Sequence, residues 1–245
     1  MTYTPYFLHG ETRPGRWLVT CDHATNTVPP QVGGGDLGLP RPDMERHIAY
    51  DVGAYGVARH LGELLNGPVI ASHFSRLVID PNRGEDDPTL LMKLYDGSVI
   101  PANRDADATE RERRLELCYR PYHAALARLA ALPHAILISI HSFTRQLRGR
   151  DPRPWEVGVL YASDDRLARP LIRLLEAEGD LTVGDNQPYS GHLPGDSIDR
   201  HALQQGRPNV LIELRNDLIA EEAGQREWAE RLAPLLQRAL EETGL

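Results

Sequence analysis

The sequence has few cysteines, no long apolar run and no excess of positive charge. Its 245 residues include two cysteines, Cys21 and Cys118, which form no Cys-x-x-Cys pair and are too few for a disulfide framework. No apolar run approaches the length of about 18 residues that a membrane helix needs. The first residues lack the basic start and apolar core of a signal peptide. We therefore expect a soluble protein of the reducing cytoplasm that has no membrane partner.

The formal net charge of -8 is spread over both halves of the chain, which argues against nucleic acid as the main partner because phosphate binding needs a basic face. A small anionic substrate stays compatible with this charge if a local group of arginines binds it. The apolar fraction of 41% and the charged fraction of 25% are ordinary for a globular protein. At this length we expect residues 1–245 to form one catalytic domain.

Short apolar runs alternate with stretches of helical period, which predicts an α/β fold with a mostly parallel sheet covered on both faces. A capping pattern, Thr109 with Glu112, opens the second helix, and Pro121 predicts a kink in it. Residues 85–108 and 184–200 read as loops. The expected strands are 17–21, 69–73, 77–79, 135–140, 157–161 and 209–214, and the expected helices are 43–65, 109–129, 165–178 and 225–242.

The stretch from Ala135 to Arg145, AILISIHSFTR, ends a buried strand at a histidine, His141. In open α/β sheets, ligands bind outside the carboxyl ends of the strands. The run WLVTC is likewise followed at once by Asp22 and His23. For either histidine taken alone, the alternative is a core residue that bonds a backbone carbonyl.

Four expected strands deliver His23, the group from Arg76 to Arg83, His141 and Glu213 to their ends. Two neutral imidazoles and one further ligand would hold a zinc ion with a position open for water. A carboxylate within an apolar strand, such as Glu213, is suited to act as general base for that water. The alternative for Glu213 is a salt bridge to Arg215 or to another arginine at a strand end.

Arg76, Asn82 and Arg83 form a polar group that suits a substrate carboxylate, because a guanidinium donates two parallel hydrogen bonds to such a group. Asp80 is placed to orient one of the arginines. The alternative for this segment is an ordinary solvated loop.

The third metal ligand stays open. Asn26, three residues after His23, is within reach of the same ion, but a neutral amide binds zinc poorly. Asp22 is a candidate for holding the imidazole of His23 from behind. Among the other histidines, His192 and His201 are favoured because they flank the ligand-rich loop at 184–200.

Five motifs in order resemble those of the N-formylglutamate amidohydrolase family, over about residues 17–217: CDHATNTVPP, SRLVIDPNRG, SIHSFTR, NQPYSG and IELRND. That family is similar to zinc carboxypeptidases and aspartoacylases, so the resemblance implies their three-layer α/β/α fold. It also implies that His23 and His141 are metal ligands. Asn26 stands where those relatives have a metal-binding glutamate, which leaves both the third ligand and the identity of the metal open.

The resemblance further implies that Glu213 is the general base and that Arg76 stabilises the oxyanion. Substrate-binding roles fall to Asn82 and Arg83 for the α-carboxylate and to Tyr189 and His201 in the loop. Arg145 and Arg148, basic residues just past His141, are candidates for binding a side-chain carboxylate, and they would be bystanders if the substrate lacked one.

The function implied is hydrolysis, dependent on zinc or another divalent metal, of the N-formyl or other small N-acyl group of an acidic amino acid such as N-formyl-L-glutamate, a reaction of histidine degradation. The alternatives are a carboxypeptidase-like peptidase and a protein that binds an acidic metabolite without hydrolysing it. The sequence does not indicate an oligomeric state.

Overall fold

The structure, a computed structural model, describes residues 3–245, so the first two residues of the amino-terminal stretch considered above lie outside it. A seven-stranded mixed sheet runs through the described residues in the order β1-β3-β2-β6-β9-β7-β8. Its strands are β1 (Tyr6–His9), β2 (Trp17–Cys21), β3 (Val69–Ser72), β6 (Ile136–Phe143), β7 (Val157–Leu160), β8 (Val183–Asp185) and β9 (Asn209–Arg215).

The four central strands, β3, β2, β6 and β9, are parallel to one another. At the edges, β1 runs antiparallel to β3, β7 runs antiparallel to β9, and β8 runs parallel to β7. The carboxyl ends of the four central strands therefore meet at one edge of the sheet.

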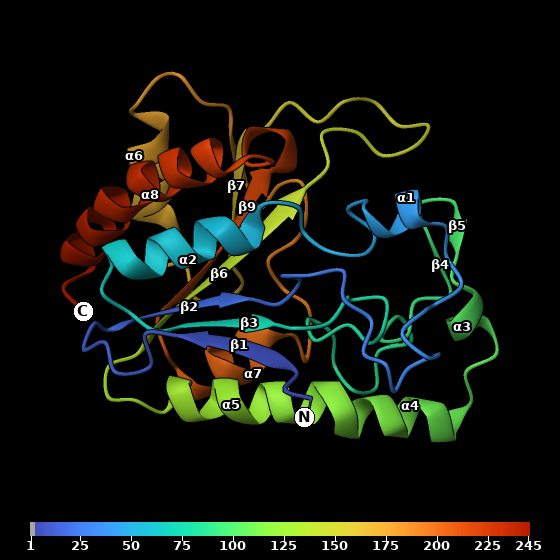
Figure 1. Cartoon of the computed structure of the whole chain (residues 1–245). Helices are drawn as coiled ribbons and strands as arrows, with labels where there is room; N and C mark the ends of the chain where they lie inside the picture. Colours follow the sequence, from blue (N-terminus) through green and yellow to red (C-terminus); the bar gives the residue numbers. More distant parts are fainter. Residues whose placement is uncertain (1–2) are drawn as a thin grey trace.

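Helices cover both faces of this sheet (Figure 1). The described α- and π-helices are α1 (Arg41–Met44), α2 (Ala54–Leu64), α3 (Pro101–Arg104), α4 (Ala108–Arg114), the π-helical η1 (Leu115–Tyr119), α5 (Arg120–Ala130), α6 (Ala168–Glu176), α7 (Ser197–His201) and α8 (Glu222–Thr243). The short 3₁₀ helices are η2 (Leu203–Gln205) and η3 (Asn216–Leu218).

Alternation along the central strands divides the apolar residues between two layers. Ile138 and Ile140 of β6 pack with α2, α6 and α8 on one face, whereas Leu137 packs with α5 and α7 on the other. This arrangement confirms the predicted α/β class, the three layers and the mostly parallel sheet. His141 and Glu213 lie at directly opposed positions of β6 and β9, so both side chains point to the face that carries α5 and α7.

Several predicted elements differ from the observed ones. The expected helix at 43–65 is two helices, α1 and α2, separated by turns, and the expected strand at 77–79 is a turn. Residues 85–108 contain α3 and a small hairpin of β4 (Leu94–Tyr95) and β5 (Ser98–Val99). Similarly, 184–200 includes the end of β8 and most of α7.

The predicted capping residue of the second helix was wrong, because the side chain of Asp107, two residues before Thr109, accepts a hydrogen bond from the amide of Glu110. Near Pro121 the helix takes a π-helical turn, η1, which ends just before Arg120. A proline has no amide hydrogen and clashes with the carbonyl four residues before it, and a wider turn relieves that clash. The irregularity predicted from Pro121 is therefore a π-helical turn.

Candidate metal centre and active site

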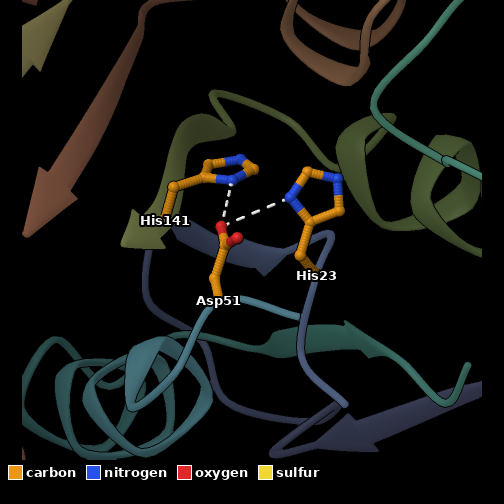
Figure 2. Close-up of side chains that lie close together, drawn as sticks. All are labelled: His23, Asp51 and His141. Carbon is orange, nitrogen blue, oxygen red and sulfur yellow. Dashed lines mark hydrogen bonds and ion pairs between the residues drawn. The ribbon is translucent and has the colours of Figure 1, made fainter. Parts of the chain in front are cut away.

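Two histidines and one aspartate converge at the carboxyl edge of the sheet. Oδ2 of Asp51 lies 2.8 Å from Nδ1 of His141 and 3.3 Å from Nδ1 of His23. Figure 2 shows both rings turned toward this carboxylate. All three side chains are buried, and one donor atom from each lies within 4.8 Å of the other two.

The far nitrogen of each ring already has a hydrogen-bond partner. Nε2 of His23 lies 2.7 Å from Oδ1 of Asp80, and Nε2 of His141 lies 3.0 Å from Oγ of Ser139. A neutral imidazole that donates from Nε2 presents a lone pair at Nδ1. Two such lone pairs and a carboxylate oxygen would then face one another, and either a proton on Nδ1 or a metal ion among the three groups would compensate their mutual repulsion.

This donor set fits a divalent metal ion. Two imidazole nitrogens and one carboxylate oxygen are ligands that zinc accepts in catalytic sites, and ligands of tetrahedral zinc stand about 3.3 Å apart. The 3.3 Å from Asp51 to His23 matches that value, whereas the 2.8 Å from Asp51 to His141 is that of a hydrogen bond. A carboxylate behind a metal-binding histidine, as Asp80 lies behind His23, fixes the orientation of the ring.

Asp51 was missed in the sequence because it lies in the turn between α1 and α2, where a continuous helix was expected. Its amide donates to the carbonyl of His23 over 2.8 Å, which ties this turn to the end of β2. Gly53 follows with a φ of +81°, and a Cβ there would lie 2.0 Å from the carbonyl oxygen of Ile219. The glycine two residues after a buried aspartate is the local signal that could have revealed the turn.

Asn26, by contrast, lies outside this group. Its side-chain amide donates to the carbonyl of Met44 over 2.8 Å. Asp51, and not the candidate Asn26, is thus the side chain that joins the two histidines. Asn26 instead fastens the loop after β2 to α1.

The expectation that Asp22 holds the ring of His23 was wrong. Asp80 occupies that place, while Oδ2 of Asp22 lies 3.6 Å from Nε2 of His141. The hydroxyl of Tyr122 on α5 donates to the other oxygen of Asp22 over 2.5 Å. Burial by itself lowers the pKa of His141, but the carboxylates of Asp22 and Asp51 outweigh it, so that the pKa lies well above its usual range.

Arg76 lies beside the same group. Its Nη2 donates to Oδ2 of Asp80 over 2.9 Å, which confirms that Asp80 orients one of the arginines. The guanidinium also lies 5.5 Å from the ring centroid of Tyr95. One carboxylate, Asp80, therefore holds both His23 and Arg76 in place.

Glu213 is buried and has no salt bridge to an arginine in the described part of the chain; Arg215, the partner considered above, pairs with Glu156 and Asp217. Its Oε2 has no hydrogen-bond partner. Burial raises the pKa of Glu213 to about 8, with His141 opposing this rise and Asp51 adding to it. A carboxylate left without a partner and with a pKa near neutrality has the properties of an acid or base catalyst.

A cavity of about 300 Å³ opens onto these groups. Its lining includes His23, Asp51, His141, Arg76 and Glu213 together with the predicted substrate residues Asn82, Arg83 and Tyr189. Nη1 of Arg83 donates to the carbonyl of Asn82, and Oδ1 of Asn82 accepts from the amide of Ser197 on α7. The side-chain amide group of Asn82 has no hydrogen-bond acceptor among the described residues.

Two of the predicted substrate residues lie away from the cavity lining. Arg145 is exposed. His201 is buried against His123, with its Nε2 at 2.9 Å from Nδ1 of that ring. The structure thus brings together the predicted metal histidines, both predicted catalytic residues and three of the five predicted substrate residues.

The chain is similar to several known proteins. Residues 15–220 match the model of a family described as N-formylglutamate amidohydrolase. A curated N-formylglutamate deformylase of Pseudomonas putida is 28% identical over 249 residues, covering 92% of this chain and 89% of its own. One of Pseudomonas aeruginosa is 28% identical over 235 residues, covering 83% and 85%.

Among solved structures, gene product Atu2144 from Agrobacterium tumefaciens is 36% identical, covers 100% of this chain and 98% of its own, and superposes with a TM-score of 0.91. An N-formylglutamate amidohydrolase from Ralstonia eutropha JMP134 is 23% identical, covers 98% of each chain and gives a TM-score of 0.58, which shows a shared fold.

Within residues 3–245, no helix combines the length and the apolar character needed to cross a membrane.

Proposed function

The chain belongs to the N-formylglutamate amidohydrolase family, and from this premise we propose that it is a metal-dependent hydrolase that removes the N-formyl group of N-formyl-L-glutamate or a related acidic N-acyl amino acid. One observation carries the proposal. The Nδ1 atoms of His23 and His141 and the carboxylate of Asp51 face one another in a cavity that Arg76 and Glu213 also line. The names of the two Pseudomonas relatives support the choice of N-formylglutamate.

His23, Asp51 and His141 would hold the metal, for which zinc fits the donor set best. When bound, a zinc ion supplies a Lewis acid that lowers the pKa of water and polarises a carbonyl. Asp80 and Ser139 fix the two rings from behind.

The remaining steps belong to the chain's own side chains. Glu213 takes a proton from the attacking water and delivers it to the leaving amine nitrogen, as an acid and base with a pKa near the working pH can do. Arg76, anchored by Asp80, donates to the oxygen on which negative charge develops. Formate and the free amino acid are the products.

Asn82 and Arg83 bind the α-carboxylate in this proposal. Arg83 is fixed by its bonds to Thr89 and to the carbonyl of Asn82, and the amide nitrogen of Asn82 remains available to donate. Donors fixed before binding lose little freedom when the substrate arrives. The two residues lie on the loop after β3, beside Arg76, so the α-carboxylate and the scissile carbonyl would be bound by one segment of the chain.

The same proposal takes residues 1–245 as one catalytic domain, since strands from both halves of the described chain share one sheet. We further propose a cytoplasmic location, which the two free, buried cysteines support. A protein that only binds an acidic metabolite would be favoured if the site had no carboxylate ligand, as Asn26 at the glutamate position suggests. Asp51 supplies such a carboxylate.

The direct test measures formate release from N-formyl-L-glutamate and amino-acid release from a panel of peptides, both with zinc-loaded protein. Hydrolysis of N-formyl-L-glutamate with little peptide turnover is expected. Glu213→Gln should lower kcat by about a thousandfold while retaining the metal. Equal or greater turnover of peptides would instead support a peptidase, and no turnover with either substrate would refute the amidohydrolase.

A further inference from the structure

The loop between β6 and β7 carries four arginines that have different surroundings. Arg145 and Arg150 are exposed, and Arg148 lies 3.8 Å from Asp43 on α1. Arg153 alone turns back toward the end of β6, where its amide donates to the carbonyl of Arg145 over 2.8 Å. The loop therefore brings the backbone of Arg153 back beside that of Arg145, two residues after the end of β6.

The guanidinium of Arg153 is held on several sides. Nη1 donates to the carbonyl of Thr144 over 3.2 Å and to the hydroxyl of Tyr189 over 3.0 Å. The group also lies 5.7 Å from the ring centroid of Phe143 and 5.0 Å from that of Tyr189. Among the described residues, Nε and Nη2 of Arg153 have no hydrogen-bond acceptor. The guanidinium is therefore fixed in place and still has N–H groups that can donate to a ligand.

The residues that hold Arg153 line the cavity. Phe143, Thr144 and Tyr189 all belong to its wall, as do Asn82 and Arg83. Arg153 lies close enough to Glu213 to oppose the rise in the pKa of that carboxyl. The hydroxyl of Tyr189 accepts from Arg153, and its own hydrogen stays free to donate because a tyrosine hydroxyl is protonated at neutral pH.

Besides Arg76, two guanidinium groups from separate elements belong to this region: Arg83 lines the cavity, and Arg153 lies against three residues of its wall, Phe143, Thr144 and Tyr189. Arg83 is fixed by the loop after β3, and Arg153 by the end of β6 and the loop after β8. A substrate with two carboxylates would satisfy both groups, with its amide between them at Arg76 and Glu213. A substrate with one carboxylate would leave one of the two arginines without an acceptor.

We infer that Arg153, together with the hydroxyl of Tyr189, binds the side-chain carboxylate of the substrate and so sets the preference for acidic N-acyl amino acids. This inference rests on the proposed function and identifies a residue that determines its specificity. Arg153, and not the candidate Arg145, then binds the side-chain carboxylate.

The test compares kcat/KM for N-formyl-L-glutamate and for N-formyl-L-glutamine, which differ only in the charge and one donor of the side chain. In Arg153→Gln we expect kcat/KM for the glutamate substrate to fall on the order of 100-fold, mainly through KM. For the glutamine substrate the change should stay within about threefold, which also shows that the variant folds. Arg153→Lys should recover part of the loss, because it restores the charge without the planar fork.

Arg150→Gln is the matched control, since it removes an exposed arginine from the same loop. Parallel losses on both substrates in Arg153→Gln, or no loss on either, would overturn the inference. So would Arg145→Gln if it, and not Arg153→Gln, removed the preference for glutamate.

If the unmodified protein hydrolysed neither substrate, the proposed function would fail separately. Calorimetric titration with L-glutamate and L-glutamine would then decide the role of Arg153 without turnover. Binding of L-glutamate should weaken on the order of 100-fold in Arg153→Gln, and unchanged binding would refute the assignment.

Discussion

Asp51 is the residue that completes the site, and neither spacing nor motif in the sequence indicates it. His23, His141 and Glu213 could be predicted because each lies at the end of an apolar run whose strand character is evident. Asp51 lies in an irregular turn and reaches the histidines only because the chain folds back over the end of β2. Its role depends on contacts distant in sequence, which local patterns do not encode.

Arg153 shows the same limit. Four arginines in one loop are equivalent in composition, and only the backbone bond from Arg153 to Arg145 and the two aromatic rings distinguish one of them. Tyr189 and Asn82, in contrast, were found through their motifs and do line the cavity.

At the residue scale, Asp51→Asn should reduce zinc affinity at least about 100-fold, because an amide replaces the carboxylate that both histidines face. Zinc bound per chain, measured after dialysis against a zinc buffer, reports this loss. Asn26→Ala is the matched variant and should keep its zinc, since Asn26 bonds Met44 instead. Loss of zinc in Asn26→Ala with retention in Asp51→Asn would contradict the assignment of ligands.

At the scale of elements, apolar strands and amphipathic helices could be predicted, while the segments between them could not. β2, β6 and β9 are buried along nearly their whole length, and α6 and α8 show the apolar spacing expected of covering helices. The split between α1 and α2 was missed because apolar residues continue at helical spacing across the turn. α2 begins only after Gly53, whose left-handed backbone conformation, and not its polarity, marks the end of the turn.

Gly53→Ala should therefore destabilise the turn that carries Asp51. A φ of +81° costs alanine about 1–2 kcal/mol, and the contact of its Cβ with the carbonyl of Ile219 adds to that cost. We expect a loss of more than about 2 kcal/mol in urea unfolding, together with weaker zinc binding. Gly179→Ala, at a φ of +77° with nothing within 4 Å, is the control and should lose only the conformational part. Equal losses in both variants would show that the close approach at Gly53 has no effect.

The bond between α5 and the end of β2 gives a second prediction at this scale. Tyr122→Phe removes the donor to Oδ1 of Asp22 and leaves a buried carboxylate oxygen unsatisfied. The free energy of unfolding should fall by about 2 kcal/mol. Tyr161→Phe removes a tyrosine–aspartate bond of similar length to the exposed Asp185 and should change stability by less than about 0.5 kcal/mol. A loss in Tyr122→Phe no larger than in this control would argue against Asp22 being anchored by α5.

At the scale of the whole molecule, the order of the strands was beyond prediction, although the class of the fold was not. The sequence indicates which segments are strands, but the order β3-β2-β6-β9 is what makes neighbours of His23, His141 and Glu213. Convergence of functional residues at the carboxyl ends of parallel strands follows from the fold class alone. The distances between these residues, and the side chains that bond them from behind, follow only from the assembled sheet.

Acid stability is a whole-molecule property that the buried pair of His123 and His201 should influence. Burial, with the charge of Arg200 adding to it, lowers the pKa of His123 to about 3 and that of His201 to about 4. Unfolded histidines titrate near 6.5, so below that pH the unfolded chain binds more protons than the folded one. Stability is therefore fully present above about pH 6.5 and is lost as the pH falls toward 4.

Urea unfolding of zinc-free protein between pH 7 and pH 4 measures this loss. His201→Gln should reduce the slope of stability against pH by about 1.4 kcal/mol per pH unit, because one of the two histidines no longer takes up a proton on unfolding. Superimposable slopes for the variant and the unmodified protein would contradict the prediction.

The measurement that bears most directly on a metal centre of His23, Asp51 and His141 is formate release from N-formyl-L-glutamate by chelator-treated protein during titration with zinc. Activity should be negligible without metal and should rise linearly until about one equivalent of zinc per chain is bound. Equal turnover with and without zinc, or no turnover at full loading, would contradict this assignment of the site.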